Sequence, residues 1–536
     1  MILDFERGDT PAQLDTDLCI VGAGAAGIAL ALEFANTHTS VTLLESGGER
    51  PEPDTQRLYD AELRGLPCAT VHDGRARVFG GTTTMWAGQA MALSETDFAV
   101  REWVTNSGWP LSLAQLEPYY RRAERLMRLP ESTYDERGWP AALPMPRSAD
   151  GIERRFSTFS PAPNFASSHR DELARAANVT VVLHANATSL SMSEDGAGVD
   201  RIELASLGGR SGWVRARRYV ICCGGVETPR LLLASTGRRT RGVGNEHDLV
   251  GRFFAEHVHV KLPVTGADRR ALARLFHGRR LSGVRHFAKL SATEALQRDE
   301  RILNVGADLC YDPDANVALR AVKELRGAAR DRRPVQAARA ALTAARHPRQ
   351  LSSAGYRRAV LRQKASEGFG PIYFCLQTET AARRESRVTL DRRVDALGMP
   401  RAIVDWRVGA PEVRTATVFA DRLDALLCRA GLGRLALSEL PRADELEGRV
   451  AGGCHHIGTT RMAADARAGV VDRDCRVFGV QNLFIAGSAV FPTSGWSNPT
   501  LTLLALGYRL ADELKRELDG VAPGVANRRL AEAVAG

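Results

Sequence analysis

The chain has 536 residues, of which 44% are hydrophobic and 25% are charged, and its formal net charge is +9. This length is beyond what one hydrophobic core usually supports, so we expect two domains of ordinary globular composition. No run of about 18 uninterrupted apolar residues occurs, so the sequence supports no transmembrane helix.

The first residues, MILDFERGDTPAQLD, are acidic and lack the basic and apolar regions of a signal peptide. The nine cysteines form no CxxC pair and show no regular spacing. This pattern predicts reduced, buried thiols in a cytoplasmic protein. Export together with a partner that carries the signal would leave the same pattern, so this alternative to the cytoplasmic prediction stays open.

A βαβ unit is predicted at the beginning of the chain. The apolar run 17–21 leads into the glycine turn Gly22-Ala23-Gly24-Ala25-Ala26-Gly27. A helix over 28–34 and a strand over 41–44 follow, and Glu45 and Ser46 come directly after that strand. The first glycine permits a tight turn, the second lets the backbone approach a pyrophosphate, and the third lets the helix pack closely. The helix N-terminus attracts phosphate, and Glu45 can accept hydrogen bonds from a ribose. The motif predicts a dinucleotide site without separating FAD from NAD.

A second glycine-rich segment, RARVFGGTTTMWAG, occupies residues 75–88. It contains Gly80-Gly81-Thr82 and, three residues later, Met85-Trp86-Ala87. Taken alone, it could be a simple loop over a core tryptophan.

Two further apolar runs end in glycine. Residues 218–223 end at Gly224-Gly225 and lead into a helix over 228–235, with Pro229 in its first turn, where a missing N–H costs nothing. Residues 483–486 end at Gly487, and a long helix follows from Pro499 to about residue 518. Three such turns in distant parts of the chain predict one α/β nucleotide-binding domain with a Rossmann-like parallel sheet, built from discontinuous segments. We assign residues 1–92, 165–255 and 453–520 to it.

Alternating apolar residues predict the strands of a different, antiparallel sheet at 257–264, 302–311, 371–378 and 387–390. We expect an α+β substrate domain made of residues 93–164 and 256–452.

A basic segment, residues 318–366, interrupts this domain. The segment contains thirteen Arg and Lys residues but only two acidic residues, Glu324 and Asp331. Its net charge of +11 therefore exceeds the net charge of +9 of the whole chain. The nearly neutral remainder argues against a nucleic-acid partner. The composition favours helix, which Pro334, Pro348 and Gly355 are expected to divide. A solvated helical lid, a contact with an anionic membrane or protein surface, and a site for anionic substrates stay open.

The last ninety residues hold the most specific motifs. They include Cys454-His455-His456-Ile-Gly458-Thr459, then Ala486-Gly487-Ser488, and finally Trp496-Ser497-Asn498-Pro499-Thr500. Together with 75–88 and 224–235, these motifs resemble the glucose–methanol–choline (GMC) oxidoreductases, in particular their pyranose oxidase and bacterial sugar dehydrogenase branch. Gly225 departs from the family pattern, which more often has a residue with a small side chain there.

This resemblance implies a non-covalent FAD, because Met85 stands where several relatives carry a histidine that attaches the flavin. It also implies that His455 removes the proton of a substrate hydroxyl, as suits a side chain with a near-neutral pKa, and that Asn498 holds the same oxygen. The expected cofactor contacts are Gly22, Gly24, Ala25, Ala26, Gly27, Glu45, Ser46, Gly80, Gly81, Thr82, Met85, Trp86, Ala87, Gly487, Ser488, Asn498, Pro499 and Thr500.

Simpler roles exist for several of these residues. Asn498 could merely cap the following helix, and Trp496 could belong to the core rather than form a stacking wall for a sugar. Cys454-His455-His456 could be a fragment of a metal site, but no second cluster has ligand spacing, so we predict no metal. We interpret His456 as a neighbour of the base.

The predicted function is therefore oxidation of a hydroxyl group of a carbohydrate, glycoside or related alcohol. The electron acceptor stays open between oxygen, a quinone and a cytochrome. The alternatives are an oxidase of a non-sugar alcohol, a lyase with the same fold, a non-catalytic flavoprotein, and an NAD enzyme.

Overall fold

The computed structural model describes the chain except for residues 69, 144–149, 313–314, 331, 360–369 and 520–536. One half is built on an eight-stranded sheet in the order β1-β7-β3-β2-β10-β9-β8, with β20 beside β10. Its strands are β1 (Ile2–Asp4), β7 (Val179–Leu183), β3 (Val41–Leu44), β2 (Gln13–Val21), β10 (Ser211–Ile221), β9 (Val199–Ala205), β8 (Asn186–Met192) and β20 (Leu483–Ile485).

This sheet is mixed, whereas the sequence predicted a parallel one. The pairs among β1, β7, β3, β2, β10 and β20 are parallel, but β9 pairs antiparallel with both β10 and β8. The links 193–198 and 206–210 explain the difference, because they are too short for the crossover that parallel neighbours need. In the parallel part, β3 is buried along its whole length, as expected of a strand that is covered on both faces.

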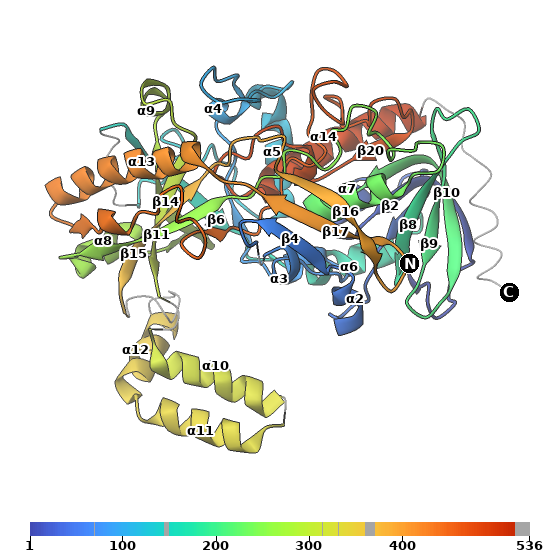
Figure 1. Cartoon of the computed structure of the whole chain (residues 1–536). Helices are drawn as coiled ribbons and strands as arrows, with labels where there is room; N and C mark the ends of the chain where they lie inside the picture. The colour runs from blue at the N-terminus through green and yellow to red at the C-terminus, as the bar shows by residue number, and fades with distance from the viewer. Residues whose placement is uncertain (69, 144–149, 313–314, 331, 360–369, 520–536) are drawn as a thin grey trace.

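Helices cover the parallel strands. The long C-terminal helix α14 (Thr500–Asp519) packs against α1 (Ala25–Glu33) and α5 (Leu113–Leu126), and α6 (Phe165–Arg175) lies against α1 and β7. Figure 1 shows α14 and α5 side by side. Helix α1 begins at Ala25, directly at the glycine turn and three residues before the predicted start.

Helix α7 (Gly224–Ala234) corrects another prediction, because it also begins at its glycine turn. Pro229 therefore lies inside the helix, not in its first turn, and cannot donate to the carbonyl of Gly225 four residues earlier. The buried Thr459 hydroxyl donates to that carbonyl at 2.7 Å instead. A Cβ atom on Gly225 would lie 2.4 Å from the carbonyl oxygen of His456, which explains the glycine at this position.

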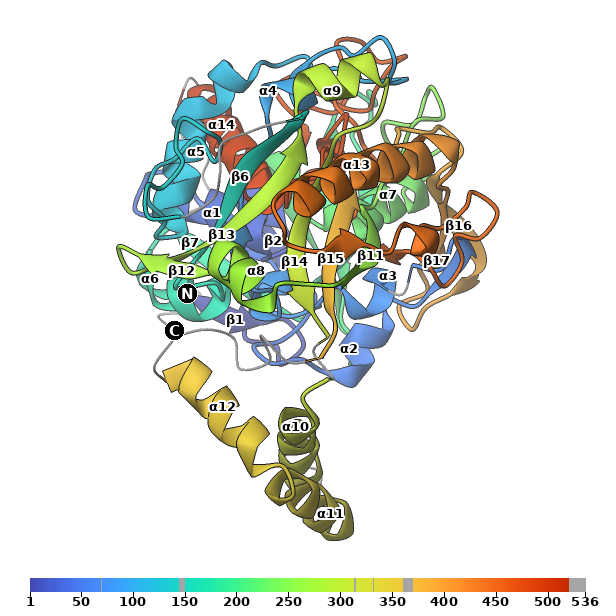
Figure 2. The same cartoon turned by 90° about the vertical axis from the view of Figure 1, so that its left-hand side faces the viewer.

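The other half is a nine-stranded sheet in which all paired strands of the described residues are antiparallel. Its order is β18-β11-β15-β14-β13-β6-β5, with β12 beside β13 and β19 beside β11. Figure 2 shows α13 (Ala410–Arg429) lying across β14 and β15. The strands are β18 (Arg434–Leu435), β11 (Val258–Thr265), β15 (Ile372–Thr378), β14 (Val305–Tyr311), β13 (Val284–Ala292), β6 (Ile152–Phe159), β5 (Gln89–Ala90), β12 (Arg279–Leu281) and β19 (Ala451–Gly452).

One predicted strand of this sheet lies elsewhere. Residues 387–390 belong to β16 (Arg387–Val394), which pairs with β17 (Pro400–Trp406), and β17 pairs in parallel with β4 (Ala61–Gly65). The alternating pattern identified the strand correctly, but its partner is the next strand of a local hairpin, which forms a separate three-stranded sheet.

The basic segment forms an arm of three helices between β14 and β15. They are α10 (Val317–Arg330), α11 (Pro334–Ala345) and α12 (Pro348–Ala359), which pack on one another. Figures 1 and 2 show the arm projecting from the body of the molecule. Pro334 and Pro348 begin helices as predicted, but Gly355 lies within α12 and does not divide it. Residues 331 and 360–366 of the predicted segment lie outside the described residues.

The remaining helices are short: α2 (Pro53–Arg57), α3 (Thr70–Asp73), α4 (Glu95–Phe98), α8 (Arg269–Phe276), α9 (Glu294–Asp299), and the 3₁₀ turns Gly81–Thr84, Leu437–Glu439 and Ser488–Val490. Among the described residues, none of the helices combines the length and apolar character needed to cross a bilayer. All nine cysteines are free thiols as predicted, but only Cys19, Cys68, Cys375 and Cys475 are buried; Cys428 and Cys454 are exposed, and the other three are partly buried.

Candidate active site

A cavity of about 630 Å³ runs between the two halves of the molecule. Its size is typical of a site for a small molecule or cofactor. All but three of the predicted site residues line it, including the glycine turn at 22–26, Glu45, Trp86, His455 and Asn498. The three exceptions are Gly27, Gly80 and Met85.

The glycine turn forms one end of the cavity. A Cβ atom on Gly27 would lie 1.9 Å from the carbonyl oxygen of Gly22, so this glycine serves the close packing of α1 on the turn. A Cβ atom on Gly24 would meet nothing within 4 Å, which leaves room beside the backbone. Gly24 is also the N-cap of α1, and no side chain caps this helix end. Free N–H groups at an uncapped helix N-terminus suit a pyrophosphate.

Glu45 ends β3 at the wall of the cavity. Its carboxylate accepts hydrogen bonds from the backbone N–H groups of Ala23 and Gly47, both at 3.0 Å. Burial raises the pKa of Glu45, against the lowering effect of these bonds and of Arg77. The carboxylate is therefore held in place at the position where a dinucleotide ribose is expected.

The second glycine-rich segment lies against the first. The Gly80 N–H donates to the carbonyl of Ala23 at 2.9 Å, and a Cβ atom on Gly81 would lie 2.9 Å from Cα of Gly24. A Cβ atom on Gly80, whose φ is +95°, would lie 2.7 Å from Cβ of Ala166, so a close contact explains each of the two glycines. Met85 is 54% exposed and does not line the cavity, unlike its neighbour Trp86.

Four charged side chains form a second polar wall. Glu227 pairs with Arg75 at 2.9 Å, Arg77 at 2.8 Å and Arg230 at 3.0 Å. Burial opposes ionisation of Glu227, but the three guanidinium groups outweigh it and lower its pKa to about 2. The cluster was not predicted from the sequence, although Arg75 and Arg77 belong to the second motif.

The structure brings His455 and Asn498 together at the other end of the cavity. Nδ2 of Asn498 lies 3.3 Å from Nε2 of His455, and both residues line the cavity. Asn498 and Pro499 immediately precede α14, so the N-terminus of this helix also faces the cavity. Burial, followed by the charges of His257 and His259, holds the pKa of His455 well below its ordinary value. A neutral imidazole is the form that can accept a proton.

Three residues that the sequence did not single out hold His455 in place. The buried carboxylate of Glu256 accepts the backbone N–H groups of His455, Gly453 and His257 at 2.8–3.0 Å. Nδ1 of His257 lies 2.9 Å from Nδ1 of His455 and 2.6 Å from Nε2 of Gln377. The alternation of His257 and His259 along an apolar strand is the sequence signal that could have indicated side chains facing one site.

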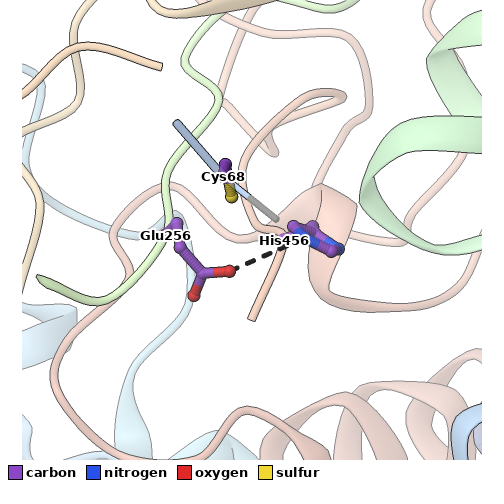
Figure 3. Close-up of side chains that lie close together, drawn as sticks. All are labelled: Cys68, Glu256 and His456. Carbon is purple, nitrogen blue, oxygen red and sulfur yellow. Dashed lines mark ion pairs between the residues drawn. The ribbon is translucent and has the colours of Figure 1, made fainter. Parts of the chain in front are cut away.

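A buried cluster behind His455 has the composition of a metal site. Ligand atoms of Cys68, Glu256 and His456 lie within 4.8 Å of one another, and Figure 3 shows Glu256 and His456 facing each other beside Cys68. However, the Thr70 hydroxyl lies 3.1 Å from Sγ of Cys68 and 3.2 Å from both the Glu256 carboxylate and Nε2 of His456. An ion bound by these three side chains would have to lie about 2.0–2.3 Å from each of them, in the space between them that the Thr70 hydroxyl already occupies. We therefore interpret the cluster as a hydrogen-bond network centred on Thr70.

The cavity wall near His455 is polar. Lys289 is only 3% exposed, and its Nζ atom lies 3.6 Å from Asp308. His259, Lys261 and Tyr311 also line the cavity. Trp496 is 2% exposed and does not line the cavity. It packs where a Cβ atom on Gly306 would lie 2.5 Å from its ring, so it belongs to the core and is not a stacking wall.

The segment that carries His455 and Asn498 is also similar in sequence to known proteins. Residues 382–507, which include His455 and Asn498, match the family model described as GMC oxidoreductase. Residues 382–507 are thus a GMC oxidoreductase C-terminal domain. The chain is 23% identical to the fructose dehydrogenase large subunit of Gluconobacter japonicus, over 94% of this chain and 98% of that protein. It is 25% identical to paromamine 6'-oxidase of Streptomyces fradiae, over 94% and 92% of the two chains.

Among solved structures, pyridoxine 4-oxidase from Mesorbium loti is similar, with a TM-score of 0.55 and 17% identity over 93% of this chain and 99% of that one. At this identity the similarity shows a shared fold. The chain is an FAD-dependent enzyme that acts on CH–OH groups of alcohols. The uncapped N-terminus of α1, the open space beside Gly24 and the carboxylate of Glu45 fit this cofactor.

Proposed function

We propose that this enzyme oxidises a hydroxyl group of a carbohydrate, glycoside or related polyhydroxylated alcohol, with His455 as the base. The observation that carries the proposal is the pairing of His455 with Asn498, 3.3 Å apart, in the cavity that the glycine turn also lines. Nε2 of His455 takes the hydroxyl proton. The Asn498 amide binds the same oxygen and so orients the carbinol carbon.

The residues that would hold FAD are the predicted ones that line the cavity. The N-terminus of α1 and Gly24 suit the pyrophosphate, Glu45 the ribose, and Thr82, Trp86 and Ala87 the flavin end. When bound, FAD supplies the acceptor for the hydride that leaves the carbinol carbon, so the alcohol loses two electrons and two hydrogens in all. Met85 at the position of the attaching histidine supports non-covalent binding.

The sugar assignment rests on the wall beside His455 and on the relatives. Lys289, Asp308, Lys261 and His259 offer several donors and acceptors around the reacting centre, as a ligand with neighbouring hydroxyl groups requires. Two full-length relatives bear the names fructose dehydrogenase and paromamine 6'-oxidase, and a partial match, 35% identical over 24% of this chain, is a C-glycoside 3-oxidase from Microbacterium trichothecenolyticum.

The test is an anaerobic screen of the purified yellow protein. Sugars, glycosides and simple alcohols are mixed with it, and the bleaching of the flavin absorbance is followed. The proposal predicts that at least one polyhydroxylated compound bleaches the flavin faster than simple alcohols do. Conversion of a substrate without bleaching would instead indicate a lyase, and bleaching by simple alcohols alone would contradict the sugar assignment. Re-oxidation with air, a quinone or cytochrome c then identifies the acceptor class.

For the basic arm we propose contact with an anionic membrane surface. Helix α11 exposes Val335 and Leu342, at 66% and 53%, on the face that also carries the exposed Arg339 and Arg346. Apolar tips among arginines suit a headgroup layer, to which each basic residue contributes about 1 kcal/mol. The arm also joins β14 and β15, which carry cavity residues such as Asp308 and Gln377.

Co-sedimentation with phosphatidylglycerol-containing vesicles tests the contact. The variant Arg339→Glu/Arg346→Glu should bind at least tenfold more weakly than the wild type, by roughly 1 kcal/mol for each basic residue removed. A charge-matched control, Arg241→Glu/Arg392→Glu, changes exposed arginines outside the arm and should bind normally. Equal binding of both variants, or binding of wild type to neutral vesicles only, would contradict the proposal.

A further inference from the structure

A chain of hydrogen bonds runs from the backbone through His257 to His455. Nε2 of His257 lies 3.3 Å from the carbonyl oxygen of Ser494. On the other side of the ring, Nδ1 of His257 faces Nδ1 of His455 at 2.9 Å and the amide nitrogen of Gln377 at 2.6 Å. Nε2 of His455, at the far end, faces Asn498 at 3.3 Å.

The groups that face the two ring nitrogens of His257 decide which of them carries the hydrogen. A carbonyl oxygen can only accept, so Nε2 of His257 carries the hydrogen that it donates to Ser494. In the neutral ring Nδ1 is then the unprotonated nitrogen, and it can only accept. Two donors share the lone pair of this nitrogen, because the Gln377 amide nitrogen faces it as well; since Nδ1 of His257 offers no hydrogen, Nδ1 of His455 can form its 2.9 Å contact only as a donor.

We propose that His257 is a positioning residue that selects the tautomer of His455: by accepting the hydrogen on Nδ1, it leaves Nε2 of His455 unprotonated toward Asn498 and the cavity. This inference rests on the proposed function, because it concerns the nitrogen that would take the hydroxyl proton. Gln377 holds the His257 ring in the accepting orientation from β15, and the Glu256 carboxylate holds the backbone of both histidines.

The charges around the pair keep His257 in its accepting form. His259 on β11, Lys289 on β13 and His456 act on the pair electrostatically, and each lowers the pKa of His455. Burial, then the charges of His259 and Lys289, lowers the pKa of His257 to about 3. At neutral pH its ring is therefore uncharged, and its Nδ1 lone pair stays available to His455.

Three substitutions of His257 separate acceptance from space filling. In His257→Asn, the amide oxygen lies as many bonds from the backbone as Nδ1 and can still accept from His455. In His257→Gln, the amide reaches the position of Nε2, which keeps the contact with Ser494 but removes the acceptor. His257→Leu removes both polar contacts.

With FAD bound at full stoichiometry, flavin reduction under anaerobic saturating substrate should be about 100-fold slower in His257→Gln and His257→Leu. His257→Asn should stay within about tenfold of the wild type, with KM little changed in all three. Equal rates in the three variants, or a faster rate in His257→Gln than in His257→Asn, would overturn the inference.

A second readout does not depend on activity or on the cofactor. Long-range ¹H–¹⁵N NMR spectra of protein with ¹⁵N-labelled histidine report which ring nitrogen carries the hydrogen, and a His455→Gln sample assigns the signals. We expect His455 protonated at Nδ1 and His257 at Nε2, in wild-type protein with or without FAD. Protonation of His455 at Nε2 would overturn the inference even if every His257 variant failed to fold.

The two proposals fail in different ways. If His455→Ala reduces its flavin as fast as the wild type, the base assignment fails. If His455→Ala is slow while all His257 variants are fast, only the role of His257 fails.

Discussion

The contact between Thr459 and helix α7 gives a prediction whose size follows from the structure. Gly225 has no helical donor for its carbonyl, because residue 229 is a proline, and the fully buried Thr459 hydroxyl replaces that donor at 2.7 Å. Thr459→Val keeps the shape of the side chain but leaves a buried carbonyl without a partner. Such a loss costs about 1–3 kcal/mol of the free energy of unfolding.

A double-mutant cycle separates this hydrogen bond from other effects. Pro229→Ala supplies a backbone N–H that can donate to Gly225 in the usual helical way, so Thr459→Val should cost less than about 1 kcal/mol in that background. The free energies of unfolding of the four proteins are measured by urea denaturation, followed by circular dichroism with FAD present in excess. An equal cost of Thr459→Val in both backgrounds would refute the explanation for the proline inside α7.

Two other predictions concern the cofactor and acid stability. Glu45→Ala should weaken FAD retention on gel filtration, while the anaerobic reduction rate per remaining flavin stays the same, since Glu45 lies at the turn and not beside His455; a slower rate at full FAD occupancy would contradict this. The pKa values of His257 and His456 are lowered to about 3 from 6.5, so the unfolded chain binds more protons between these values. Their stabilising contribution is complete above about pH 6.5 and is lost as the pH falls. Glu256, with its pKa raised to about 7, and Glu45, whose pKa burial also raises, act in the opposite sense, but His455, whose pKa lies well below its ordinary value, adds a third histidine to the first two. The urea midpoint should therefore fall between pH 7 and 4, and His456→Asn should flatten that dependence; a midpoint that rises on acidification would refute the assignment.

The nucleotide-binding half was largely predictable because its signals are local. The strand over residues 41–44 is an apolar run between polar ends, and β3 has those bounds. The starts of α1 and α7 were placed too late because the glycine turns were counted as loop, whereas Gly27 lies inside α1 and α7 begins at Gly224. Helix starts at glycine turns depend on the free N–H groups facing a cavity, which composition alone does not show.

The pairing of His455 with Asn498 was expected from the family resemblance and not from spacing. His257 and Gln377 were missed for a physical reason. They reach His455 only because β11 lies between β15 and β19 in the antiparallel sheet, and no local pattern encodes that neighbourhood. The Thr70 network was missed for the same reason, since Glu256 and His456 meet Thr70 from distant segments.

The most direct test of the central claim is single-turnover reduction of the flavin by His455→Ala, without oxygen and at full FAD occupancy. We expect this variant to keep its cofactor, but its flavin should be reduced on the order of 100-fold or more slowly than that of the wild type. A variant that retains FAD and is reduced at the wild-type rate would contradict this claim.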